Sequence, residues 1–345
     1  MRQFEFIRPQ SVEQAIRVHA TAHTTDQNAA MRVGEGVYLA GGTTLLDLVK
    51  LDVMRPARVI DIHRLGMDRI DRLPDSRLRI GALVTNTTLA YDPIVVRDYP
   101  VLSQALLSGA STALRNKATT AGNVMQRVRC GYFRDGVSPC NKREPGSGCA
   151  AVGGHHRSLH AVLGGSDHCI AAHPSDMCVA MAAIGATVHV QGAAGERDIA
   201  FADFHLLPGN TPWREHALAN DEIITHVTLD APLANARSGY LKRRDRASYQ
   251  FALASCAVIL SLDGNTVHEA RVALGGVATK PWRAIKAEQM LRGTSLSTAS
   301  PDVWQRAAAA ALDGAHDYGQ NGFKIALCEQ AIVRNLSRLA SGGTV

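Results

Sequence analysis

The chain has 345 residues, of which 46% are hydrophobic and 20% charged, which excludes a mainly disordered protein. A single core stops growing near roughly 250–300 residues, so two or three domains are expected. The net charge is +6, but the basic residues are scattered and aromatic residues make up only 5%, which argues against a nucleic-acid partner. No apolar run approaches the ~20 residues of a membrane span, and no export signal is expected in this chain.

Alternating helices and strands are predicted for the first half of the chain. Ser11 is the candidate N-cap of the first helix, and Gln14 completes a capping box. Periodicity predicts helices and strands in the order helix 11–23, strand 37–40, helix 45–53, strand 58–65, strand 78–84 and helix 93–111. A glycine turn over 119–124 and a long cysteine-rich segment follow. After them the pattern predicts a helix and strand over 177–190 and a hairpin over 195–204.

The composition changes over 232–248, where a second domain is expected to begin. Two apolar strands joined by the turn 263–265 are predicted next, followed by helices at about 281–293, 301–314 and 322–340. The whole pattern predicts an α+β protein. Its first domain spans 1–231, with subdomains of about 1–60 and 61–231, and its second spans 232–345 as a sheet with helices.

Two turns of small residues are candidate phosphate sites. Gly41 and Gly42 lie between a predicted strand and helix, where glycine permits close backbone approach and successive N–H groups form an anion nest. The sequence matches neither G-x-G-x-x-G nor a Walker A loop, so a purely structural turn is the competing interpretation. The segment TTAGN over 119–123 adds a second such turn. Asp176 is a candidate acceptor for ribose hydroxyls. The competing interpretation is a helix N-cap, which either Ser175 or Asp176 would fill.

The seven cysteines fall into two groups, and their odd number argues against a disulfide framework. Three lie in apolar runs and are predicted to be core thiols: Cys178, Cys256 and Cys328. The other four lie in a segment that has little means of making its own core: Cys130, Cys140, Cys149 and Cys169. Between 129 and 158 the only branched aliphatic residues are Val137 and Val152. A metal bound by the four thiolates would stabilise this segment in place of an apolar core.

Three interpretations of these four cysteines compete. They are free thiols, a zinc site, or an iron–sulfur cluster. Zinc sites usually contain a C-x2-4-C pair, whereas the spacing here is C-x9-C-x8-C-x19-C. Nearby histidines can replace missing ligands, namely His155, His156, His160, His168 and His173. On spacing alone, zinc and iron–sulfur are close to even.

Four segments in order carry a family resemblance: LAGGTTLLDLVK, RNKATTAGNVMQR, HPSDM and GYLKRRDRASYQFALAS. They resemble the FAD-binding medium subunit of the molybdenum hydroxylases, the family of xanthine dehydrogenase, aldehyde oxidoreductase and CO dehydrogenase. The segment RCGYFRDGVSPCNKREPGSGC resembles a narrower branch, the bacterial aldehyde oxidoreductase flavin subunits that carry an additional [4Fe-4S] cluster. The resemblance covers nearly the whole chain.

The resemblance implies an FAD site and a cluster site, with no residue assigned to catalysis. The implied FAD residues are Ala40, Gly41, Gly42, Thr43, Thr44, Leu45 and Leu46 in one loop, Thr120, Gly122 and Asn123 in a second, Asp176 near the adenosine, and Ile223, Ile224 and Lys242 near the flavin. The implied cluster ligands are Cys130, Cys140, Cys149 and Cys169, the cluster loop spanning 128–174. Ala121 stands where many relatives have glycine, so that turn must accommodate a Cβ atom.

The implied fold is the two-subdomain FAD-binding fold of the vanillyl-alcohol oxidase and CO dehydrogenase flavoprotein type, with a C-terminal CO dehydrogenase flavoprotein domain. The implied partners are a large subunit with the molybdenum cofactor, a small subunit with [2Fe-2S] clusters, and an external electron acceptor. The expected location is cytoplasmic, or periplasmic through co-export with a small subunit that bears the signal. The alternatives are a stand-alone flavin oxidase and a zinc-stabilised scaffold without redox function.

Overall fold

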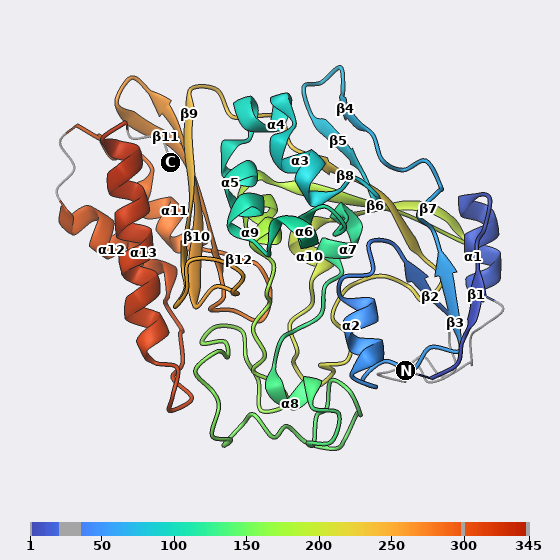
Figure 1. Ribbon diagram of the computed structural model, residues 1–345. Coiled ribbons are helices and arrows are strands. Elements are labelled where there is room, and N and C mark those ends of the chain that lie inside the picture. Colours follow the sequence, from blue (N-terminus) through green and yellow to red (C-terminus); the bar gives the residue numbers. More distant parts are fainter. Residues whose placement is uncertain (1, 21–35, 298–300, 343–345) are drawn as a thin grey trace.

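The computed structural model describes residues 2–20, 36–297 and 301–342. Within these residues the strands form three sheets, of three, five and four strands. Figure 1 shows them side by side, with the parallel sheet and the C-terminal sheet at opposite ends. The mixed α+β class predicted from the sequence is confirmed.

A small parallel sheet, in the order β1-β3-β2, forms the N-terminal end. Its elements are β1 (Glu5–Ile7), α1 (Val12–Ala20), β2 (Gly36–Leu39), α2 (Leu45–Lys50) and β3 (Arg58–Asp61). Ser11 caps α1 by accepting a hydrogen bond from the Gln14 amide, at 3.2 Å. The Gln14 side chain accepts from the Gln10 amide instead of completing the expected capping box. The last three residues of the predicted helix, 21–23, lie outside the described residues.

A five-stranded antiparallel sheet, in the order β4-β5-β8-β6-β7, forms the centre. Its strands are β4 (Ile70–Arg72), β5 (Leu78–Gly81), β6 (Ala186–Gly192), β7 (Gly195–Ala200) and β8 (Ile223–Leu229). The helices beside it are α3 (Asn86–Tyr91), α4 (Pro93–Asp98), α5 (Pro100–Ser108), α6 (Thr112–Arg115), α7 (Thr120–Val124), α9 (Asp176–Ile184) and α10 (Phe201–Phe204). The single helix predicted over 93–111 is divided at Tyr99, because a residue before proline avoids the helical conformation.

The C-terminal sheet is antiparallel in the order β12-β11-β10-β9 and is covered on both faces. Its elements are β9 (Ala236–Arg243), β10 (Ala254–Asp263), β11 (Thr266–Gly275), β12 (Trp282–Arg283), α11 (Ile285–Leu291), α12 (Pro301–Ala311) and α13 (Phe323–Ala340). Helix α13 packs on β10 from one side, and α5 and α9 pack on the sheet from the other. Burial on both faces explains the mainly apolar sequence of β10, in which only Asp263 is exposed.

Most of the cysteine-rich segment lies below the three sheets in Figure 1, and it contains α8 (Gly131–Arg134). Val162 and Leu163 of the segment pack into the core of the C-terminal sheet. Val137 and Val152 are exposed and do not form the segment's core. Instead Phe133 is buried against Leu48 and Val53, at the end of α2, together with two of the cysteines. The expectation that the segment lacks a core of its own is therefore corrected in part, because it shares one with α2. No helix in the described ranges is long and apolar enough to cross a membrane.

Candidate FAD site

A cavity of about 750 Å³ opens between the parallel sheet, the start of α7 and the residues that lead into β8. We call it the FAD cavity, and its volume lies within the range of cofactor sites. Most of the sequence-predicted FAD residues line it: Ala40, Gly41, Gly42, Thr43, Thr44, Leu45, Gly122, Ile223 and Ile224. The remaining five lie outside the lining: Leu46, Thr120, Asn123, Asp176 and Lys242.

The first glycine turn supplies the free backbone donors of this cavity. Gly42 has φ +73°, a conformation that residues with a side chain rarely adopt. A Cβ atom on Gly41 would lie 2.0 Å from the Lys117 carbonyl oxygen, so only glycine fits there. Among the described residues, the amides of 42–45 have no protein acceptor. These amides therefore form a nest suited to an anionic group.

The second glycine turn is the capped start of α7 rather than a second nest. Thr119 Oγ1 accepts a hydrogen bond from the Gly122 amide, at 3.3 Å. The amides of Thr120 and Ala121 donate to backbone oxygens of the segment after β5. Thr119, Ala121 and Gly122 line the cavity, while Thr120 is fully buried beneath it. Asn123 accepts from the Ser175 hydroxyl at 2.8 Å, which ties the turn to the start of α9.

Asp176 and Lys242 form a buried ion pair with each other. Lys242 Nζ lies 2.7 Å from Asp176 Oδ2, and the two side chains are 4% and 7% exposed. The Tyr240 hydroxyl donates to the other carboxylate oxygen at 2.6 Å, and burial beside Asp176 raises the Tyr240 pKa well above its ordinary value. Ser175, not Asp176, is the N-cap of α9. The pair therefore joins α9 to β9, and its predicted contact with the cofactor stays a prediction.

We expect Lys242→Met to destabilise the protein by about 3–5 kcal/mol, because Asp176 would keep a buried charge without its cation. Denaturant unfolding followed by circular dichroism measures the change. Lys286→Met is the control, since its pair with Asp313 is exposed and screened by water, so its loss should change stability little. Equal losses in the two variants would contradict the role of the buried pair.

One side of the cavity carries charged side chains that were not predicted from the sequence. It is formed by residues 213–222 together with Arg127 and Arg197. Glu215 is its central charge, because it pairs with Arg127 and, at 3.2 Å, with Lys142. Burial alone would raise the pKa of Glu215, but Arg127 and Lys142 hold it at about 2. Residues 213–222 lie in a loop without periodicity, whereas Arg197 lies in β7 and Arg127 follows α7, and no sequence signal joins them.

The four cysteines of the cysteine-rich segment line one small cavity, which we call the cysteine cavity. Cys140 and Cys149 face each other across an isolated antiparallel bridge. Burial raises the pKa of the Cys130 thiol to about 12, and it also raises that of Cys169, where Lys142 opposes the rise. Among the described residues, no three of these sulfur atoms lie within 4.8 Å of one another.

A different group of ligand atoms lies between α9 and the loop after α10. One atom each of His173, Cys178 and His205 lies within 4.8 Å of the other two. The Ser175 amide donates to His173 Nδ1 at 3.4 Å, which places the ring proton on Nε2. That nitrogen then has no lone pair for a cation. Cys178 is buried as a core thiol, as are Cys256 and Cys328, which agrees with the sequence prediction.

The fold and the cavity define a flavoprotein-type subunit, and comparisons with known proteins identify its family. Residues 2–232 match the model of the FAD binding domain in molybdopterin dehydrogenase, and residues 239–339 match that of the CO dehydrogenase flavoprotein C-terminal domain. The chain therefore belongs to the FAD-binding medium subunits of the molybdenum hydroxylase family, as the motifs predicted.

Two relatives and one solved structure place the chain within this family. It is 49% identical to the aldehyde oxidoreductase FAD-binding subunit PaoB of Escherichia coli K12, over 90% of this chain and 93% of that one. It is 23% identical to the glyceraldehyde dehydrogenase medium chain of Sulfolobus acidocaldarius, over 86% of this chain and 83% of that one. The structure of carbon monoxide dehydrogenase from Hydrogenophaga pseudoflava matches with a TM-score of 0.75 and 24% identity, over 99% of both chains, which establishes the fold.

Proposed function

We propose that this chain is the electron-transfer subunit of an aldehyde oxidoreductase complex. The observation that carries the proposal is the 49% identity to an aldehyde oxidoreductase FAD-binding subunit over nine-tenths of the chain. The large subunit would hold the molybdenum cofactor and oxidise the substrate, and the small subunit would hold [2Fe-2S] clusters. Electrons would reach this chain from the small subunit and leave to an external acceptor.

The residues of the FAD cavity fit the cofactor that the family binds. The free amides of 42–45 suit the pyrophosphate, since they are donors without protein acceptors. Ile223 and Ile224 offer apolar surface for the flavin ring, and Gly122 leaves room beside α7. Bound FAD accepts and passes on electrons. The chain's own contribution is to bind and orient it and to set the charge around it through Arg127, Glu215 and Arg197.

The four cysteines support a [4Fe-4S] cluster as a second centre of this chain. All four thiols line the cysteine cavity, and the segment resembles flavin subunits that carry such a cluster. A tetrahedral zinc ion with Zn–S bonds of about 2.3 Å would hold its four sulfurs roughly 3.8 Å apart. Among the described residues no three of these sulfurs lie within 4.8 Å of one another, so they do not form such a compact set, and a larger group suits them better than zinc.

Co-expression with the neighbouring genes tests the complex. We expect the chain to copurify with a large and a small subunit, and aldehyde oxidation to require all three. The chain alone should show no aldehyde oxidation, because its assigned residues serve electron transfer rather than substrate chemistry. Full aldehyde turnover by the isolated chain would instead establish the stand-alone flavin oxidase. A colourless protein that contains zinc and no flavin would establish the scaffold.

The proposed location follows the small subunit. A twin-arginine signal on that subunit would carry the folded complex to the periplasm, and its absence would leave the complex in the cytoplasm. Fractionation of cells that express all three genes distinguishes the two locations.

A further inference from the structure

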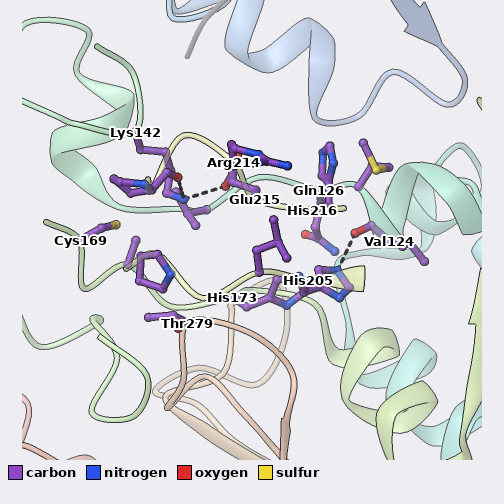
Figure 2. A pocket seen from close by; sticks show the side chains of 16 residues that line it. Val124, Gln126, Lys142, Cys169, His173, His205, Arg214, Glu215, His216 and Thr279 are labelled. Carbon is purple, nitrogen blue, oxygen red and sulfur yellow. Dashed lines mark hydrogen bonds and ion pairs between the residues drawn. The ribbon is translucent and has the colours of Figure 1, made fainter. Parts of the chain in front are cut away.

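The cysteine cavity and the FAD cavity are joined by a small buried pocket of about 30 Å³, which we call the bridging pocket. Lys142 and Cys169 line both the cysteine cavity and the bridging pocket. At the other end, Glu215 and His216 line both the bridging pocket and the FAD cavity. Figure 2 shows Lys142 and Glu215 linked across this pocket, with Cys169 on the lysine side and His216 on the other.

A row of three charges runs from the cysteine cavity to the FAD cavity; the first two line the bridging pocket and the third lines the FAD cavity. Lys142 Nζ lies 3.2 Å from Glu215 Oε1 and donates to the Pro212 carbonyl oxygen at 2.8 Å. The second carboxylate oxygen of Glu215 pairs with Arg127, which lines the FAD cavity. The three side chains are 7%, 18% and 15% exposed, so water screens their charges little. We call this row the ion triad.

Lys142 connects the ion triad to the cysteines through charge. Lys142 and Cys169 are both buried and line the cysteine cavity and the bridging pocket together. A metal cluster is bound by deprotonated thiolates, and these would give Lys142 a second anionic partner beside Glu215.

A second connection joins the cysteine-rich segment to the first glycine turn. Arg134 pairs with Asp47 of α2 at 2.6 Å, and Arg129 donates to the Thr44 hydroxyl at 3.2 Å. Phe133 packs on Leu48 of the same helix. The cysteine-rich segment therefore supports the FAD cavity on two sides, through α2 and through Glu215.

We propose that occupancy of the cysteine site strengthens FAD binding through the ion triad, with Glu215 as the positioning residue that couples the two. This inference rests on the proposed metal cluster at the four cysteines. Thiolates bound to a cluster would attract the ammonium group of Lys142 and fix its position. The ion pair with Lys142 then fixes Glu215, and the pair with Glu215 fixes Arg127 at the edge of the FAD cavity. Because binding free energies are reciprocal, bound FAD must slow loss of the cluster by the same coupling.

Titration of FAD against flavin-free protein, followed by quenching of flavin fluorescence, measures the coupling. The titration is made on iron-containing protein and on protein stripped of iron by a chelator under reducing conditions. Coupled sites typically change each other's affinity by about 5–150-fold, and we expect about tenfold weaker FAD binding after stripping the wild-type chain. In Glu215→Gln the link through the ion triad is absent and only the one through α2 remains, so the same stripping should change FAD affinity clearly less than in the wild type, by about twofold.

Lys142→Met gives an independent test, since Lys142 does not line the FAD cavity. We expect this variant to bind FAD several-fold more weakly than the wild type, even without iron, because Glu215 loses one of its two cations. Lys280→Met is the matched control, because Lys280 likewise donates to a backbone carbonyl at 2.8 Å but lies outside the ion triad. Its FAD affinity should not change.

Two results would overturn the inference. One is an equal effect of stripping in wild type and Glu215→Gln, which would show that the coupling bypasses the ion triad. The other is unchanged FAD affinity in Lys142→Met. A chain that never contains iron would refute the cluster proposal separately, and the Lys142→Met comparison would then decide alone whether the ion triad supports the FAD cavity.

Discussion

Purified Gly42→Val protein is expected to contain less than about a tenth of the FAD of the wild type. Gly42 has φ +73°, and a left-handed conformation costs a residue with a side chain roughly 1–2 kcal/mol, more for a β-branched one. A Cβ atom would also lie 3.0 Å from a Leu39 methyl group and 3.1 Å from one of Leu46. The turn must move, and the free amides of 42–45 move with it. FAD released by acid and measured by absorbance gives the occupancy.

Gly66→Val is the matched control for this variant. Gly66 has φ +69°, nearly the same backbone strain, and it does not line the FAD cavity. Apart from its chain neighbours, no atom of the described residues lies within 4 Å of its added Cβ. This variant should lose stability without losing FAD. Full FAD occupancy in Gly42→Val would mean that the first glycine turn does not hold the cofactor. Flavin that stays on the polypeptide after acid treatment of the wild type would contradict non-covalent binding.

Replacing Cys140 with serine is expected to remove the iron and acid-labile sulfide of the isolated chain, about four of each in the wild type. Cys140 is buried beside Phe133 in the core shared with α2, and its thiol lines the cysteine cavity. Serine is a poor ligand for this cluster, and loss of the cluster should open residues 128–174 to protease. Iron and sulfide analysis with limited proteolysis measures both effects.

Cys256→Ser is the control for this substitution, because Cys256 is also buried but lies in β10, far along the chain from the cysteine cavity. Its iron content should equal that of the wild type. Stoichiometric zinc without iron in the wild-type chain would end the cluster hypothesis. Iron retained in Cys140→Ser would mean that this residue is not among the ligands.

The long periodic elements and several short ones were predictable from the sequence, and the three-residue strands were not. Strand β10 and helix α13 bury long apolar faces, so their composition alone identifies them. Strands β1 and β4 have three residues each and acquire their conformation from pairing with β3 and β5, which no local pattern encodes. The division of one predicted helix into α4 and α5 was readable from Pro100, whose effect on the preceding residue was overlooked.

The part of the candidate site that depends on backbone conformation, the first glycine turn, was predictable from the sequence. Gly41 is required because a Cβ atom would collide with the Lys117 carbonyl group, and Gly42 is required because its φ is positive. Both requirements are visible in the sequence as glycine residues. Glu215 leaves no such mark, because its partners Arg127 and Lys142 are 88 and 73 residues distant and are joined only by the fold. Asp176 and Lys242 pair with each other between α9 and β9, and their assignment to the cofactor stays a prediction.

The two ends of the cysteine-rich segment lie close together. Asn123, just before the segment, accepts a hydrogen bond from Ser175, just after it, at 2.8 Å. A chain that leaves and returns at one point can lengthen or shorten there without reordering any strand, and the entropy of closing it grows only slowly with its length. The architecture thus permits a second centre to be gained or discarded as one module, while the sheets around the flavin keep their connections.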